Sequence, residues 1–242
     1  MRIFLLFLYA MFSVVYSFSQ DVNAGSLAQI QDNNTIALYN NYTDGNAAVF
    51  NGAAYSYYAF RMDGDPFFQS TNSSPGWISY KGEKYDPLYM LYDITRNQVV
   101  VLLPTSDMRA AVLHNEFVDS FQIAGHTFIS LKEDHQQNLY NTGFYDVLYR
   151  GSLQLFARRT KVMTESLENN YVLTIISPKD LFYIHKKGLY YLVNNKKDVF
   201  RVLADRKSEI KKMMRRQHLK LNHKTFGSTL VSVVEFYGHA VH

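Results

Sequence analysis

Short aromatic and β-branched runs, separated by turn residues, dominate the chain from residue 77 to residue 193. In the runs 117–123 and 126–131, apolar residues alternate with polar ones, as in a strand that buries one face. The runs 85–94 and 98–103 are rich in Tyr, Leu and Val, which suit a pleated surface. The pattern predicts a hairpin-rich antiparallel sheet, with residues 48–68 as a first hairpin and 108–114 as a further strand.

Glycine marks the expected turns. Five X-Gly pairs lie beside or between the runs: Asn51-Gly52, Lys81-Gly82, Ala124-Gly125, Arg150-Gly151 and Lys187-Gly188. A two-residue type I′ turn needs positive φ at both positions, and only glycine adopts it freely. Ala124 fits such a turn poorly, which favours a longer loop there. Asn tolerates positive φ, so Arg96-Asn97 is a further expected hairpin tip.

The apolar spacing changes to three and four residues after residue 194. One such series predicts a helix over 198–217: Val199, Val202, Leu203, Ile210, Met213 and Met214. Asn195 or Asp198 is the expected cap. A second helix is expected over 224–237, with a strand as the alternative for that segment. The predicted fold class is mainly β with C-terminal α: an antiparallel sandwich or a partly open barrel with one or two helices packed on it.

The N-terminal segment has the pattern of a cleaved signal peptide. Arg2 precedes an apolar stretch over 3–15, and Ser17 and Ser19 place small residues before a cut at Gln20. The stretch is shorter than the roughly 20 residues that a span requires, so no transmembrane span is expected after cleavage. The predicted organisation is a signal peptide (1–19), a polar N-terminal segment (20–47), an antiparallel β domain (48–194, with a candidate sub-boundary at 132–141) and a basic helical tail (195–242).

Composition restricts the fold class and the cellular location of the protein. The 242 residues include 19 Tyr and 17 Phe, which favour sheet, and they can form one large β domain or two small ones. The absence of cysteine excludes disulfides, thiol catalysis and lipid attachment at a cysteine. With the signal pattern, this predicts an exported protein that is periplasmic or associated with the cell surface.

Several runs resemble those of uncharacterised exported proteins of Bacteroidetes-type bacteria. They are Gly64-Asp65-Pro66-Phe67-Phe68, Tyr80-Lys81-Gly82, the run 87–93 (PLYMLYD), Ala124-Gly125-His126-Thr127-Phe128 and the run 143–151 (GFYDVLYRG). The resemblance covers most of the mature chain and implies a hairpin-rich sheet followed by a basic helical tail. It implies no activity, cofactor or catalytic residue. The relatives carry Asn-Gly or Asp-Gly where this chain has Lys81-Gly82 and Ala124-Gly125, a departure that weighs against tight turns here.

No motif marks a catalytic, cofactor or metal site. The eight histidines lack the spacing of a zinc helix, and no Gly-x-Ser-x-Gly occurs. Turn chemistry accounts for Asp63-Gly64-Asp65 before Pro66 better than a calcium loop or a pair of catalytic carboxylates. His126, with Asp93 elsewhere in the sheet, is the one pair that could serve catalysis. A structural, hydrogen-bonded histidine is the favoured interpretation.

Charge is strongly asymmetric. Residues 196–220 hold ten Lys or Arg and three Asp or Glu, a net +7, whereas the whole chain is +4 and the remainder therefore −3. This predicts contact with an anionic surface (lipid headgroups, polysaccharide or an acidic protein face) through Lys207, Lys211, Lys212, Arg215 and Arg216. The simpler and favoured interpretation is a solvated helix face whose apolar stripe packs on the sheet. Nucleic acid is not an expected partner of an exported chain.

These features predict an exported, non-catalytic binding or structural protein of the cell envelope, acting on an envelope component or a protein partner. The alternative is an exported hydrolase that uses His126 and sheet carboxylates. An outward aromatic row would instead indicate sugar or peptide binding. The candidates for it are Tyr57, Tyr58, Trp77, Tyr89, Tyr92, Tyr190 and Tyr191, although core packing is the favoured interpretation for most of them.

Overall fold

The computed structural model describes residues 48–103, 109–168 and 171–239. The predicted signal peptide (1–19) and polar segment (20–47) lie outside these residues.

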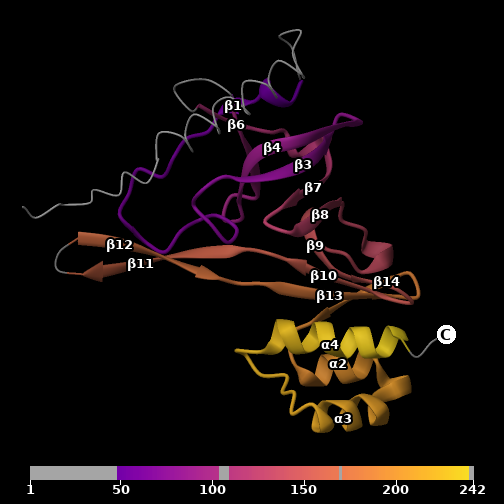
Figure 1. The fold of residues 1–242 in the computed structure, drawn as a ribbon. Coiled ribbons are helices and arrows are strands. Elements are labelled where there is room, and N and C mark those ends of the chain that lie inside the picture. Colours follow the sequence, from indigo (N-terminus) through magenta and orange to yellow (C-terminus); the bar gives the residue numbers. More distant parts are fainter. Residues whose placement is uncertain (1–47, 104–108, 169–170, 240–242) are drawn as a thin grey trace, which may run out of the picture.

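Eleven strands form one open antiparallel sheet in the order β1-β6-β5-β4-β3-β7-β8-β9-β10-β13-β14 (Figure 1). They are β1 (Ala53–Ala54), β3 (Ser74–Tyr80), β4 (Glu83–Asp93), β5 (Gln98–Leu102), β6 (Ala110–Val112), β7 (Val118–Ile123), β8 (His126–Leu131), β9 (Gly143–Arg150), β10 (Gln154–Arg158), β13 (Leu181–Lys186) and β14 (Leu189–Val193). A second sheet holds β11 (Lys161–Glu168), β12 (Tyr171–Pro178) and β2 (Met62–Asp63). The prediction of a mainly β fold with C-terminal helices is confirmed.

The hairpin turns are tighter than expected. Ala124 and Gly125 form a two-residue turn with φ of 50° and 78°, and Ile123 pairs directly with His126. The prediction of a longer loop is therefore wrong. A left-handed alanine costs about 1–2 kcal/mol. The strand pairing offsets this cost, because Phe121 stacks on Phe128 across the same hairpin with ring centroids 4.9 Å apart.

The predicted first hairpin over 48–68 is also wrong. β1 pairs with β6, and β2 pairs in parallel with β12, so the two strands in this segment belong to different sheets. Gly52 precedes β1 and lies against the backbone of β6, where a Cβ would overlap the carbonyl oxygen of Val112. The glycine therefore allows close approach of two backbones. The strand expected over 108–114 is present as β6, within 110–112.

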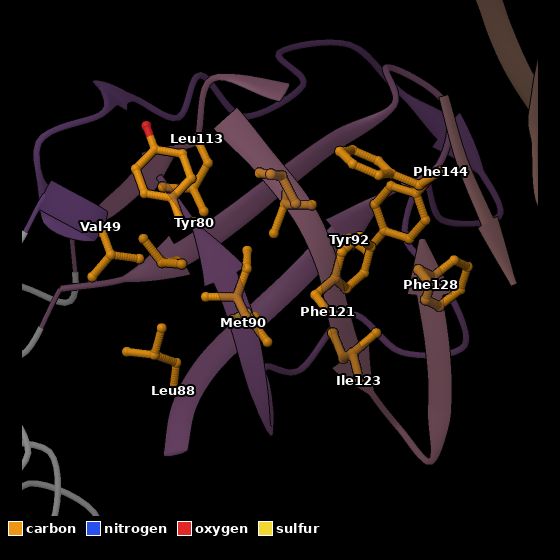
Figure 2. Close-up of a cluster of buried hydrophobic side chains, with 14 of the residues drawn as sticks. Val49, Tyr80, Leu88, Met90, Tyr92, Leu113, Phe121, Ile123, Phe128 and Phe144 are labelled. Atoms are coloured by element: carbon orange, nitrogen blue, oxygen red, sulfur yellow. The ribbon is translucent and has the colours of Figure 1, made fainter. Parts of the chain in front are cut away.

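The first half of the sheet, from β1 to β9 in the strand order above, curls around an aromatic core (Figure 2). The second half consists of β10, β13 and β14. Tyr92, Phe121, Phe128 and Phe144 pack in the aromatic core, mostly edge to face, and all four are buried. Edge-to-face pairing is a favourable arrangement of aromatic rings. Tyr92 thus belongs to the core and is excluded from any outward aromatic row.

Three helices cover the second half of the sheet: α2 (Lys196–Val202), α3 (Lys207–Arg216) and α4 (Phe226–His239). They lie on the side of β10 and β13 away from the first half (Figure 1). Leu155 and Ile184 face these helices, whereas Phe156 and Tyr183 lie in a separate cluster. This alternation follows from the two-residue period of a strand. The second predicted helix is confirmed as α4.

The single helix expected over 198–217 is wrong, because it is interrupted. α2 ends at Val202, and the short 3-10 turn η4 (Ala204–Arg206) precedes α3. Leu203 at the break has φ −104° and ψ 36°, outside helical geometry, and is fully buried. The break brings Asp205 to Lys186 on β13 and to the Tyr237 hydroxyl on α4, at 2.8 and 2.6 Å. Three helices thus replace the one or two expected.

Candidate functional site: a basic pocket on the helices

The helix α3 separates apolar from basic side chains. Ile210, Met213 and Met214 are buried in the core that the helices form with Leu155, Ile184 and Val193 of the sheet, which we call the second core. All five predicted contact residues are exposed: Lys207, Lys211, Lys212, Arg215 and Arg216. The helical period places the two sets on different faces.

The carboxylates of this segment are already engaged. Asp198 pairs with Arg201 at 2.9 Å, Asp205 with Lys186 at 2.8 Å and Glu209 with Arg206 at 2.5 Å. Of the ten Lys and Arg of residues 196–220, Arg201 and Arg206 are used in this way, which leaves eight. Within the described residues these eight form no ion pair, and we refer to them as the unpaired cations: Lys196, Lys197, Lys207, Lys211, Lys212, Arg215, Arg216 and Lys220.

Some of the unpaired cations converge on a pocket of about 380 Å³, which we call the basic pocket. Its lining residues are Lys196, Phe200, Lys211, Met214, Arg215, His218, Leu219 and Lys220. Among the described residues, no carboxylate lines it. The ammonium groups of Lys196 and Lys211 lie 5.9 and 5.6 Å from the centroid of the Phe200 ring, within the range of a cation–π contact.

Local structure builds this pocket. The Asn195 side chain accepts hydrogen bonds from the backbone N–H groups of Lys197 and Asp198, so Asn195 is the cap of α2. Lys196 and Phe200 then stand four residues apart on one side of α2. At the other end, His218 has φ 55°, and the Leu219 N–H donates to the carbonyl of Met214. This left-handed residue turns the chain back over α3.

Asp205 does not line the basic pocket and is engaged by other partners. The Lys186 Nζ donates to Asp205 and to the carbonyl of Val202, at 2.8 and 3.1 Å. Burial by itself would raise the pKa of Asp205, but the hydrogen bonds from Lys186 and Tyr237 outweigh it and hold the pKa below its ordinary value. Asp205 is therefore an ionised anchor between helices and sheet.

His126 does not meet Asp93. Its Nδ1 lies 2.9 Å from Oδ2 of Asp146, which also accepts from Nε and Nη2 of Arg159 at 2.9 and 2.7 Å. Arg159 reaches Asp180 at 2.6 Å as well. Sequence reasoning missed Asp146, and the available signal was one acid inside the otherwise apolar run 144–149. The pairing of Phe128 with Asp146 between β8 and β9 creates the contact.

Comparison of the chain with protein-family models, curated proteins and solved structures finds no match.

Asp93 has a structural role. It is fully buried and accepts hydrogen bonds from the hydroxyls of Tyr55 and Tyr58 at 2.9 and 2.8 Å. It also accepts from the backbone N–H groups of Thr95 and Arg96, both at 2.9 Å. These bonds hold the β4–β5 turn against the segment before β2 and leave the carboxylate fully engaged.

Asp65, directly before Pro66, is likewise used in a turn, whereas Asp63 belongs to strand β2. Asp65 accepts from the Phe67 N–H at 2.9 Å, and Lys161 of β11 reaches Asp65 Oδ1 at 3.0 Å. Among the described residues, no three His, Cys, Asp or Glu side chains group as metal ligands would. No helix in the same part of the chain has the length and apolar character needed to cross a bilayer.

Several of the candidate aromatic side chains lie in different surroundings. Tyr57 is 60% exposed and packs edge-on against Tyr55, in the segment that precedes β2. Tyr190 and Tyr191 line a second pocket of about 370 Å³ with Tyr140 and Tyr183. Of the aromatic candidates, Tyr190 and Tyr191 are the two that line this pocket.

Proposed function

We propose that this is an exported, non-catalytic binding or structural protein of the cell envelope that docks on an anionic surface through the unpaired cations of α2 and α3. The observation that carries the proposal is the partition of charge in residues 196–220. Every carboxylate there is held by Arg201, Arg206 or Lys186, so the eight unpaired cations remain available to a partner. Export rests on the N-terminal signal pattern, and a periplasmic or cell-surface place follows from it.

The contact would be peripheral and electrostatic. An amphipathic helix enters a bilayer interface with its apolar face, but Ile210, Met213 and Met214 of α3 are buried in the core. What remains is charge attraction, about 1 kcal/mol per Lys or Arg close to an anionic membrane. Salt weakens such attraction because the screening length is roughly 8 Å at physiological ionic strength.

Co-sedimentation with vesicles tests this proposal. The protein without residues 1–19 is mixed with phosphatidylglycerol or phosphatidylcholine vesicles at low and high salt. We expect salt-sensitive binding to the anionic vesicles only, weakened at least tenfold when Lys211, Lys212, Arg215 and Arg216 are all changed to Gln. The matched control changes four exposed lysines outside these helices to Gln: Lys81, Lys132, Lys179 and Lys187.

Both variants lose the same net charge, so the control should bind nearly as the parent protein does. Equal weakening of both variants, or no binding to anionic vesicles at low salt, would contradict the proposal.

The hydrolase alternative rests on one observation, the 2.9 Å contact between His126 and Asp146. A carboxylate and the imidazole that it orients are two of the three members of a catalytic triad. Arg159 shares the same carboxylate oxygen, which suits a structural ion cluster equally well. The test is turnover of p-nitrophenyl acetate. The hydrolase hypothesis requires activity that His126→Gln abolishes and that His135→Gln, at an exposed position of the short 3-10 helix His135–Gln137, retains.

A further inference from the structure

We infer that the basic pocket binds the phosphate group of an organic phosphate whose apolar substituent lies on the Phe200 side of the pocket. This inference deepens the proposed function and rests on it, because it assigns a specific ligand class to cations that the proposal treats as a docking surface.

The charge of the pocket calls for an anion. Lys196, Lys211, Arg215 and Lys220 line the same 380 Å³ hollow without a carboxylate among the described lining residues. Like charges that converge repel one another, and walls of low dielectric strengthen the field between them. A bound anion would relieve this repulsion, whereas a neutral ligand would not.

The type of cation favours phosphate. The guanidinium of Arg215 can donate two parallel hydrogen bonds to a phosphate or carboxylate. The three lysines offer point charges from α2, from α3 and from the loop after α3. A phosphate monoester carries a charge of roughly −1.5 to −2 at neutral pH and has three strongly accepting oxygens. It can therefore satisfy more of these donors than a carboxylate can.

The apolar lining favours a substituent on that phosphate. Phe200, Met214 and Leu219 contribute to the pocket beside the cations. Phe200 and Met214 are otherwise buried in the second core, so their position is held by packing. Ligand sites in proteins are typically apolar hollows of about 300–1,000 Å³ with a few placed polar groups. The basic pocket has this character, and inorganic phosphate alone would leave its apolar part uncovered.

The helix α3 provides a matched pair of variants. Lys211 and Arg215 stand four residues apart and line the pocket, whereas Lys212 and Arg216 do not. Each member of the second pair follows a member of the first and is rotated by about 100° around the helix. The double substitution of Lys211 and Arg215 by Gln and that of Lys212 and Arg216 by Gln therefore remove equal charge from exposed positions of the same helix.

Isothermal titration of the protein without residues 1–19 tests the inference, with inorganic phosphate and hexyl phosphate as probes. A buried methylene is worth roughly fourfold in affinity, so we expect hexyl phosphate to bind at least tenfold more tightly than inorganic phosphate. The pocket pair of substitutions should lower hexyl phosphate affinity at least tenfold, and the neighbouring pair less than threefold. All four side chains are exposed, and the thermal unfolding midpoint of each variant confirms that it folds.

Two results would overturn the inference: equal affinity for both probes, or equal loss in both double variants. If the vesicle binding of the proposed function persists in that case, docking is diffuse and only the pocket fails. If the parent protein binds neither anionic vesicles nor hexyl phosphate, both the proposed function and the inference about the pocket fail.

A vesicle arm identifies the source of the phosphate. With phosphatidic acid vesicles, a larger loss for the pocket pair than for the neighbouring pair supports a lipid phosphate as the natural ligand. Equal losses on vesicles, with the pocket-specific loss on hexyl phosphate retained, support a soluble organic phosphate.

Discussion

At the scale of single residues, the two buried carboxylates among the described residues, Asp93 and Asp146, each accept hydrogen bonds from several partners. Asp146 is 1% exposed and sits between His126 and Arg159. An ion pair of this kind contributes little net stability when complete but is damaging when one partner is removed, because the other charge is left desolvated.

Asp146→Asn should therefore be strongly destabilising. We expect the free energy of unfolding to fall by about 3 kcal/mol, since Arg159 stays largely buried with less compensation. The measurement is urea denaturation at pH 7. Asp180→Asn is the control, because Asp180 is 29% exposed and meets Arg159 through one nitrogen, and it should cost about 1 kcal/mol. Equal effects would contradict the central role of Asp146.

The lowered pKa of Asp205 predicts that the stability of the protein depends on pH. This carboxyl has a pKa below the ordinary 3.8 in the folded protein, so its contribution to stability is fully present above about pH 4 and is lost as the pH falls through the folded value. Because the side chain is 53% exposed, the contribution should be below about 1 kcal/mol. The stability difference between the parent protein and Asp205→Asn should shrink between pH 7 and pH 3. A difference independent of pH would contradict this.

At the scale of elements, the hairpin turns tolerate unsuitable residues. Lys81, Ala124 and Lys187 all have φ between 50° and 54° and precede a glycine of positive φ. Each turn carries a local cost that strand pairing outweighs, because the flanking strands fix the length of the loop. The resemblance weighed against tight turns at the first two of these sites, and both are tight.

Replacing the first residue of such a turn by Asn should stabilise the protein. For Lys187→Asn we expect a gain of about 0.5–1 kcal/mol, because Asn adopts positive φ at lower cost than Lys. Lys132→Asn is the matched control at an exposed position without positive φ. Thermal unfolding measures both. A gain at Lys132 equal to that at Lys187 would show that the effect is not conformational.

At the scale of the whole molecule, the three helices cover the apolar face of β10 and β13 and share a hydrophobic core with it. Leu155, Ala157 and Ile184 of the sheet share one core with Val199, Ile210 and Val233 of the helices. The tail predicted over 195–242 is thus part of the hydrophobic core in its described residues. The exposed Lys and Arg side chains of α3 lie on the solvent side of a helix whose other side is part of this core.

Truncation after Asn195 should accordingly abolish cooperative folding. The second half of the sheet would expose its apolar face, and we expect aggregation or a broad, low-temperature transition in place of a single sharp one. Circular dichroism during heating measures this. A soluble truncated protein with the parent's unfolding midpoint would show that the sheet folds alone.

The candidate site was predicted in part. The five residues of α3 predicted to contact an anionic surface are exposed, because helical periodicity separates them from Ile210, Met213 and Met214. The pocket was not predictable, since it needs Lys196 from α2 and Lys220 from beyond α3 to meet around Phe200. That meeting depends on the break at η4, where Leu203 is buried and no local signal ends the helix.

The sequence by itself determined the features that depend on near neighbours: the alternating strands, the position of the hairpin turns at Lys81-Gly82, Ala124-Gly125 and Lys187-Gly188, the helical spacing after residue 194 and the excess of positive charge in residues 196–220. Such patterns reflect backbone geometry and side-chain period within a few residues. Only the tertiary structure decided that His126 meets Asp146, that β1 pairs with β6, and that eight cations remain unpaired. Each of these outcomes brings together segments that are far apart in the chain. Strand register and burial determine them, and a pattern within a few residues cannot predict either.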